Sequence, residues 1–126
     1  MKYPKPKPVS RKKLIKELDS VFSVFIRKRD KKCVQCGTTK NLTCGHLFSR
    51  VAHSTRWSEK NCHCQCTGCN MAHEYNPHKF VLWFIRKFGV TAYELLNRQY
   101  NTTAKNTNQE LQLLILHYRA LNEKVK

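Results

Sequence analysis

Two cysteine pairs of the form C-x-x-C constrain the fold of this chain more strongly than any other feature. The first pair is Cys33 and Cys36, and the second pair, Cys66 and Cys69, begins thirty residues after the first one ends. One such turn brings two thiolates to a tetrahedral ion, and two turns complete a four-sulfur zinc site. A redox dithiol, which is the alternative, needs only one pair beside alternating strands and helices. The spacing therefore predicts a structural zinc ion that holds residues 33–69 together.

The chain has 7 cysteines, and the remaining three need a separate explanation. On an extended strand, alternate residues point to one side, so we expect Cys62 and Cys64 to be small buried residues beside the zinc site. An assignment in which Cys62 or Cys64 replaces Cys66 as a ligand stays open, and so does a contact between Cys44 and zinc. The odd number of cysteines argues against a complete disulfide framework.

The charge of the chain indicates the kind of partner. Lysine and arginine number 24 against 8 acidic residues, which gives a net charge of +16. A field of this sign favours a polyanion, although a generally basic structural protein would share it. No apolar run approaches the roughly 20 residues that cross a bilayer, and the N-terminus lacks the apolar core of a signal peptide. We therefore expect a cytoplasmic protein with reduced thiols.

The length of 126 residues suits one domain with one core. Residues 1–10, rich in proline and lysine, are interpreted as an extended basic arm, and residues 11–126 as a single zinc-stabilised domain with its centre at about 33–89. From 33 to 70 the chain is poor in long apolar runs, as expected where a metal replaces part of a hydrophobic core. The sequence predicts an α+β fold that is mostly helical.

Apolar residues at helical spacing predict four helices around this centre. The first follows Ser10 as N-cap, and its apolar stripe comprises Leu14, Leu18, Val21, Phe22, Phe25 and Ile26. A second helix over HKFVLWFIRKF is opened by Asn76 or Pro77 and stopped by Gly89, and Thr91 caps a third that reaches Tyr100. The last helix covers residues 108–124. The stripes of the first and last helices would form either core or a dimer interface.

Histidine and asparagine residues before and after the second cysteine pair are candidate site residues. A short β-prone run ends in Gly45 and His46, Asn61 follows fifteen residues after His46, and Asn70 and His73 lie one helical turn apart just beyond Cys69. A histidine on a strand, an asparagine in the connecting loop and a histidine on the next helix are the arrangement of His-Asn-His nucleases. The alternatives are a strand-end histidine or further zinc ligand at His46, and a surface histidine at His73.

The segment from Cys33 to about Gly89 resembles the NinG/Rap family of lambdoid phage recombination proteins and, more distantly, junction resolvases of the phage endonuclease VII type. The resemblance covers about half of the chain. It is carried by CVQCG, the GH of TCGHLFSR, TRWSEKN, QCTGCN and FVLWFIRKFG.

The resemblance implies a ββα-metal nuclease core of the HNH or His-Me finger kind, treble-clef-like, with a zinc site made of four cysteines. It further implies cleavage of Holliday junctions or D-loops with Mg²⁺ or Mn²⁺. His46 would be the general base, Asn61 would orient its loop, Asn70 would bind the catalytic cation, and His73 would be a further cation ligand or an acid. One departure is Gly45, because related nucleases often carry aspartate directly before the base, and His73 or Glu74 would have to compensate for the missing carboxylate.

Contact with DNA should be electrostatic, because a junction is recognised by its shape and backbone path. We expect Arg50, Arg56 and Lys60, in the loop before the second cysteine pair, to flank a bound strand. Cutting a near-symmetric junction in matched pairs would be easiest for a homodimer. The competing hypothesis is a non-catalytic zinc module that binds nucleic acid, or a phage regulator, and Gly45 is the best argument for it.

Overall fold

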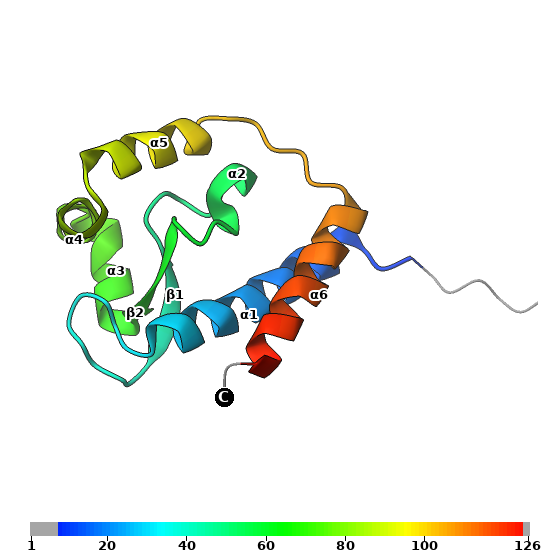
Figure 1. Ribbon diagram of the computed structural model, residues 1–126, viewed down its shortest axis with the longest axis horizontal. Helices are drawn as coiled ribbons and strands as arrows, with labels where there is room; N and C mark the ends of the chain where they lie inside the picture. The colour runs from blue at the N-terminus through cyan, green and yellow to red at the C-terminus, as the bar shows by residue number, and fades with distance from the viewer. Residues whose placement is uncertain (1–7, 125–126) are drawn as a thin grey trace, which may run out of the picture.

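The computed structural model describes residues 8–124, so most of the predicted basic arm lies outside the described residues. Its elements are α1 (Arg11–Asp30), β1 (Leu42–His46), α2 (His53–Arg56), β2 (Cys62–Cys66), α3 (Thr67–Tyr75), α4 (His78–Phe88), α5 (Val90–Tyr100) and α6 (Asn108–Lys124). The fold is mostly helical with one two-stranded sheet, as predicted (Figure 1). Within residues 8–124, no helix combines the length and apolar character that would be needed to cross a membrane.

Helix α1 begins where the sequence predicts. Ser10 is its N-cap, and the Ser10 hydroxyl accepts a hydrogen bond from the Lys13 N–H at 3.2 Å. The predicted stripe has four buried members, Leu14, Leu18, Phe22 and Ile26. Its other two members, Val21 and Phe25, are partly buried. The stripe is therefore confirmed as core.

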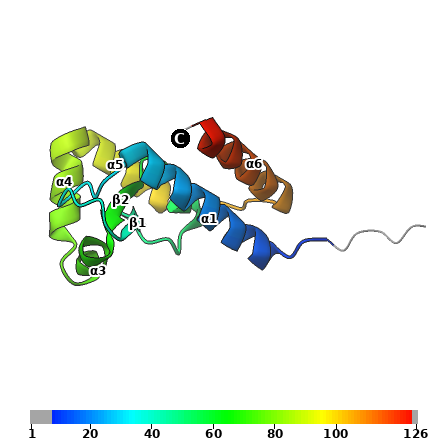
Figure 2. The same ribbon diagram turned by 90° about the horizontal axis from the view of Figure 1, so that it is seen from below.

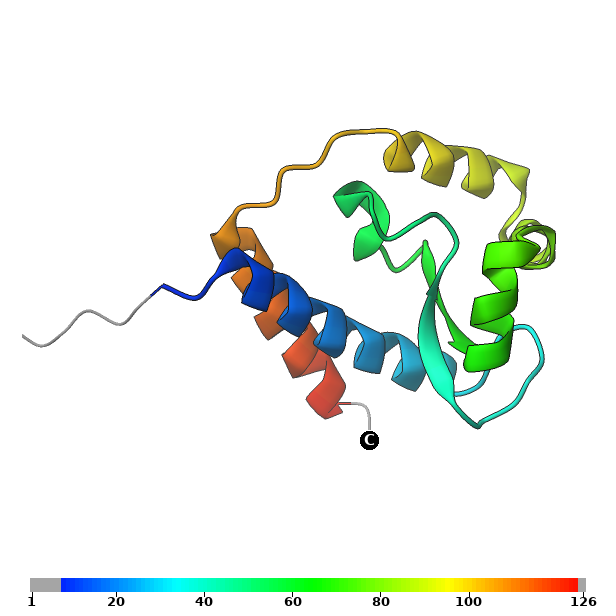
Figure 3. The same cartoon turned by 180° about the vertical axis from the view of Figure 1, so that it is seen from behind.

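Helix α6 covers this stripe. Leu111, Ile115 and Tyr118 are its buried residues, and the Tyr118 ring meets the Phe22 ring edge-on with centroids 5.0 Å apart. Figure 2 shows α6 running beside α1, and Figure 3 shows the pair from behind the view of Figure 1. The apolar stripes of the first and last helices are thus used against each other within one chain.

The two strands form an antiparallel hairpin that separates two groups of side chains. Leu42 pairs with Cys66 and His46 pairs with Cys62, so the residues between them alternate between the two faces. The face toward α1 carries Cys44, His46, Cys62 and Cys64, of which Cys62 and Cys64 are fully buried in the core, as expected. The opposite face carries Thr43, Gly45, His63 and Gln65 and is covered by α3 and α4.

A second, smaller core lies under α4 and α5. Leu47, Phe80, Phe84 and Leu96 are its buried members. Gly89, with φ of 93°, ends α4 and directly precedes α5, a conformation that favours glycine. The prediction that Thr91 caps the next helix is wrong, because α5 begins at Val90 and Thr91 already lies in its first turn.

The short helix α2 was not predicted from the sequence. It lies within the segment of residues 47–61 that connects the two strands, and four residues are too few to show a helical period. Its importance is positional, because it carries Arg56 and brings that backbone close to the end of β1.

Candidate functional site

The two cysteine pairs converge at one end of the hairpin. The sulfur atoms of Cys33, Cys36, Cys66 and Cys69 all lie within 4.8 Å of one another, and Cys36 Sγ is 3.7 Å from Cys66 Sγ. Sulfurs of a tetrahedral zinc site, with zinc–sulfur bonds of about 2.3 Å, are about 3.8 Å apart. The four thiols therefore fit one zinc ion, and Cys66 joins the cluster rather than Cys62 or Cys64.

Backbone donors support the same assignment. The N–H of Cys36 points to Cys33 Sγ at 3.5 Å, and the N–H of Cys69 points to Cys66 Sγ at 3.4 Å. Burial opposes ionisation of Cys33, but backbone N–H groups at its sulfur prevail and lower the pKa of this thiol to about 6. A deprotonated sulfur held by N–H donors is the form that binds zinc.

His46 lies at the last position of β1 and is held by α2. Its Nε2 is 2.9 Å from the backbone oxygen of Arg56. A carbonyl can only accept, so Nε2 carries the proton and Nδ1 keeps a lone pair. Burial lowers the pKa of His46, and the positive charge of Arg50 acts in the same direction, while the Arg56 carbonyl opposes the shift. The imidazole is therefore neutral at cellular pH.

The Asn61 side chain forms hydrogen bonds with the segment that follows β1. Its side chain is fully buried, where its Oδ1 accepts from the Phe48 N–H at 2.8 Å and its Nδ2 donates to the Phe48 oxygen at 3.0 Å and to the Thr55 oxygen at 3.1 Å. These bonds connect Asn61, directly before β2, to the residues just after β1 and to α2. Such contacts are what a residue that orients this loop would make.

Asn70 and His73 lie on α3, over the other face of the hairpin. Asn70 Nδ2 donates to Thr43 Oγ1 at 3.2 Å, and His73 Nε2 is 3.1 Å from the Leu47 backbone oxygen. The His73 Nδ1 is buried and has no hydrogen-bond partner in the described structure. His73 is therefore anchored against the hairpin, with one free nitrogen.

The structure does not bring all the predicted site residues to one face. Thr43, the neighbour of Asn70, and His46 are three positions apart on β1, so their side chains leave opposite faces of the hairpin. His46 instead lies with Cys44 and Cys62, whose ligand atoms all lie within 4.8 Å of one another. On the α3 face, the position beside Gly45 is filled by the Gln65 side chain.

The three predicted DNA contacts have different surroundings. Arg50 is 65% exposed, and Lys60 is exposed as well. Arg56 differs from both, because only 13% of its side chain is exposed and its Nε donates to Asp19 Oδ1 at 3.0 Å. This pairing does not favour a phosphate contact, which stays a prediction. Asp19 also accepts from the Trp57 indole N–H at 2.9 Å. Arg56 is therefore an internal partner of α1.

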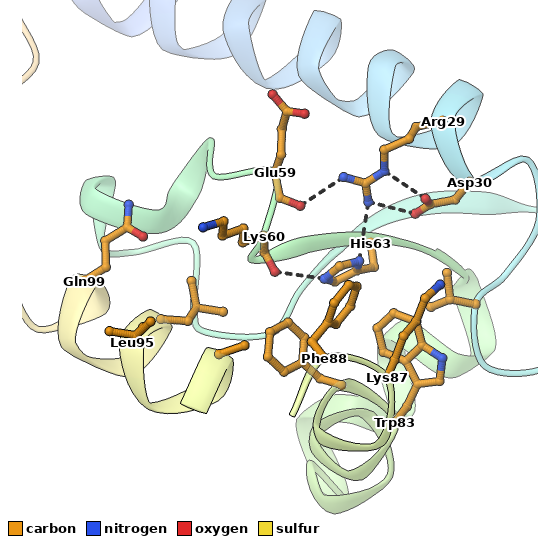
Figure 4. Close-up of a pocket in the computed structure, with 14 residues that line it drawn as sticks. Arg29, Asp30, Glu59, Lys60, His63, Trp83, Lys87, Phe88, Leu95 and Gln99 are labelled. Atoms are coloured by element: carbon orange, nitrogen blue, oxygen red, sulfur yellow. Dashed lines mark hydrogen bonds and ion pairs between the residues drawn. The ribbon is translucent and has the colours of Figure 1, made fainter. Parts of the chain in front are cut away.

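Sequence reasoning missed a cluster around His63, on the α3 and α4 side of β2 (Figure 4). The His63 Nε2 is 2.9 Å from the Lys60 backbone oxygen, and its Nδ1 is 3.4 Å from an Arg29 nitrogen. Its ring meets the Trp83 ring edge-on at 4.9 Å between centroids. Strand alternation predicts that the His63 side chain points to the face opposite that of Cys62. No local pattern in the sequence indicates that Arg29 and Trp83 are its neighbours.

Comparison with known proteins places the chain in a phage family. The family model described as "Bacteriophage Lambda NinG protein" matches residues 1–126. The chain is 31% identical to protein ninG of Salmonella phage P22 over 83 residues, which are 62% of this chain and 41% of that protein. It is 29% identical over 92 residues to protein ninG of Escherichia phage lambda (69% of this chain, 45% of that protein) and of Escherichia phage 933W (69% and 46%).

The chain thus spans less than half the length of the curated relatives that it matches. No solved structure matches it. Because the family model covers every residue, the chain belongs to the bacteriophage NinG protein family.

Proposed function

We propose that the protein is a metal-dependent endonuclease that cuts branched DNA, such as Holliday junctions and D-loops. The observation that carries the proposal is the state of His46 at the end of β1. It is neutral, it is oriented by the Arg56 carbonyl, and its second nitrogen is available to accept a proton. The order of elements, a two-stranded hairpin followed at once by α3 with four clustered cysteines, is the order expected of a ββα nuclease core and supports the proposal.

The proposed reaction is hydrolysis of a phosphodiester. His46 Nδ1 takes a proton from a water molecule as the water oxygen attacks phosphorus. The bond to the sugar oxygen breaks, and this oxygen leaves with the bonding electrons and takes a proton from solvent. The loop held by Asn61 keeps the His46 side chain in place during this step. Zinc in the four-cysteine cluster would be fully coordinated by sulfur, so its role is structural.

The catalytic cation would lie at α3. A bound Mg²⁺ or Mn²⁺ would neutralise charge on the scissile phosphate. Asn70 Oδ1 and the unpartnered His73 Nδ1 are the atoms of α3 that could hold it. Gly45 contributes no carboxylate, so further ligands would have to come from phosphate and water.

Matched assays can test catalysis. Plain duplex, single strand, flap and four-way junction are incubated with Mg²⁺, Mn²⁺ or chelator and resolved on a gel. We expect cleavage of branched substrates, and His46→Ala should lower it by about 100-fold or more while keeping the fold, the zinc and junction binding. His117→Ala, at an exposed position of α6, is the control and should leave the rate unchanged. If the wild-type chain cuts none of these substrates with either ion, it is not a nuclease.

The second candidate function is a zinc-stabilised nucleic-acid-binding module without catalysis. The observation in its favour is that His46 and the pair Asn70 and His73 leave opposite faces of the hairpin. Such a module would bind branched DNA in the same assay and leave it intact. Junction binding that is unaffected by His46→Ala, together with no cleavage by the wild type, would select this function.

A further inference from the structure

A cavity of about 670 Å³ opens between the end of α1, the beginning of β2, and helices α4 and α5. Its volume is within the range of pockets that hold small organic molecules. Trp83, Phe84, Phe88 and Leu96 form the apolar wall, and Lys60 and Lys87 lie at its border (Figure 4). None of these residues belongs to the zinc cluster or surrounds His46.

The aromatic wall is unusual because part of it remains uncovered. Phe88 is 47% exposed, although its ring packs against Phe84 at 4.9 Å and meets Trp83 edge-on at 6.0 Å between centroids. Lys87 Nζ lies 5.4 Å from the centre of the Trp83 ring and 5.7 Å from that of Phe88. A cation therefore stands directly beside aromatic faces that a planar ligand could cover.

The opposite wall is rigid and electrically balanced. Arg29 can only donate and the Lys60 carbonyl can only accept, so His63 is held as the neutral tautomer with its proton on Nε2. Burial lowers the pKa of His63 to about 4, which agrees with this state. Arg29 in turn donates to both Asp30 oxygens, at 2.8 and 3.0 Å. The charge of Arg29 is thus matched within the protein.

The lysines at the border are not matched in this way. Among residues 8–124, no acidic side chain lies within ion-pair distance of Lys60 or Lys87. Glu59, the nearest acid in sequence to Lys60, accepts instead from the Tyr118 hydroxyl of α6 at 3.1 Å. Two free cations thus border an aromatic cavity in a chain of net charge +16.

We propose that this cavity binds an unpaired nucleobase of DNA, with the base stacked on the Trp83 ring, its edge toward the nearly perpendicular Phe88 ring, and the adjoining phosphates beside Lys60 and Lys87. Aromatic side chains stack on any base, and lysines track the backbone without regard to sequence. A base inside a duplex is stacked between its neighbours and cannot enter, so the cavity selects strands with unpaired positions, as found at branch points and in displaced strands. The proposal deepens the proposed function, on which it rests for DNA as the partner.

Binding can be measured separately from cutting, with the full chain and without added Mg²⁺ or Mn²⁺. Fluorescence anisotropy gives the affinity for labelled oligothymidine and for a duplex of mixed sequence. Trp83→Ala should weaken binding of oligothymidine by about tenfold, because stacking contributes roughly 1–3 kcal/mol per base, and should change duplex binding far less. Trp83→Phe, which keeps a flat ring, should restore most of the loss.

The matched control is Leu82→Ala. Leu82 is the exposed neighbour of Trp83 on α4 and does not border this cavity, so its loss should leave both affinities unchanged. Zinc content and circular dichroism verify the fold of every variant. A junction that carries 2-aminopurine at an unpaired position should change its fluorescence with the wild type and not with Trp83→Ala.

Three outcomes would overturn the proposal. The first is equal binding of oligothymidine by the wild type, Trp83→Ala and Leu82→Ala. The second is equal loss of single-strand and duplex binding in Trp83→Ala. The third is occupation of the cavity by an apolar dye that oligothymidine does not displace. In each case cleavage of branched DNA by the wild type would still support the nuclease, whereas base binding without any cleavage would overturn the nuclease alone.

Discussion

Gly45 and Gln65 share one space on the α3 face of the hairpin. A Cβ atom added at Gly45 would lie 1.8 Å from Gln65 Oε1, and Gly45 itself is buried. The Gln65 side chain is fully buried, its Nε2 donates to Gln35 Oε1, and its own Oε1 has no hydrogen-bond partner in the described structure. An aspartate at position 45 would therefore require the buried Gln65 side chain to move. The backbone itself does not require glycine here, because the φ of Gly45 is not positive.

Introducing that aspartate should damage the fold rather than restore a cation ligand. Gly45→Asp places a carboxylate against a buried amide, and overpacking of this kind destabilises a domain by about 1–3 kcal/mol or more. Urea unfolding measures the change. Gly45→Asp combined with Gln65→Ala should recover part of the stability, and a fully stable Gly45→Asp single variant would contradict the described packing.

Loss of the zinc cluster should unfold the central region. Binding free energy at such a site is also folding free energy, of about 10 kcal/mol or more, so Cys69→Ser or a chelator should abolish cooperative melting. Cys64→Ser is the control, because Cys64 is fully buried in the same strand as Cys66 and lies outside the cluster. It should keep its zinc and lose only packing stability. Normal melting of Cys69→Ser would show that the ligands are wrongly assigned.

The number of zinc ions decides the role of His46. If His46 is a base, the folded chain should hold about one zinc, and His46→Ala should not change that number. The group of Cys44, His46 and Cys62 is the alternative, since its ligand atoms are close enough for an ion. Elemental analysis that finds two zinc ions per chain, with one lost in both His46→Ala and Cys44→Ser, would make His46 a ligand.

Arg50 and Arg56 should respond differently to the same substitution. Arg56→Ala leaves the half-buried carboxylate of Asp19 with the Trp57 indole N–H and a 4.0 Å ion pair to the exposed Arg50, and should destabilise the fold by about 1–3 kcal/mol. Arg50→Ala should leave the melting temperature almost unchanged. It should reduce the slope of log affinity against log salt for junction DNA by about one unit, as expected for one phosphate contact. Equal slopes for the wild type and Arg50→Ala would remove Arg50 from the interface.

Stability should fall with acid because of His63. The pKa of His63 is about 4 in the folded chain, owing mainly to burial, against about 6.5 when exposed. Between these values the unfolded chain binds a proton that the folded chain excludes, so His63 contributes least stability at pH 4 and its full share above pH 6.5. The expected slope approaches about 1.4 kcal/mol per pH unit. His63→Asn should flatten this slope in urea titrations at constant zinc content.

Local patterns predicted much of this molecule. Helical spacing identified the buried stripe of α1, and the two C-x-x-C turns identified the four clustered thiols. Alternation along β2 correctly placed Cys62 and Cys64 on the buried face of the strand. Each of these features depends on residues close together in the sequence, where the periods of helix and strand apply.

The features that were missed depend on the pairing of distant segments. His46 and Cys62 share one face of the hairpin because the register pairs them across the two strands. Arg56 donates to Asp19, a residue 37 positions earlier in the sequence. The sequence shows that position 45 lacks a carboxylate. It does not show that the Gln65 side chain fills the space beside Gly45, because this contact depends on the pairing of the two strands. No local period encodes such relationships.

The contact between α1 and α6 also determines the order in which the chain can be completed. Asn122 donates to the Val21 oxygen across 101 positions, so the part of the α1 stripe that packs on α6 stays uncovered on the ribosome until α6 has emerged. The zinc ligands and the smaller core, by contrast, all lie between residues 33 and 96. Folding during synthesis thus has a local step that requires the metal and a later step that requires α6. Aggregation is most favoured between these two steps, while apolar residues of α1 are still exposed.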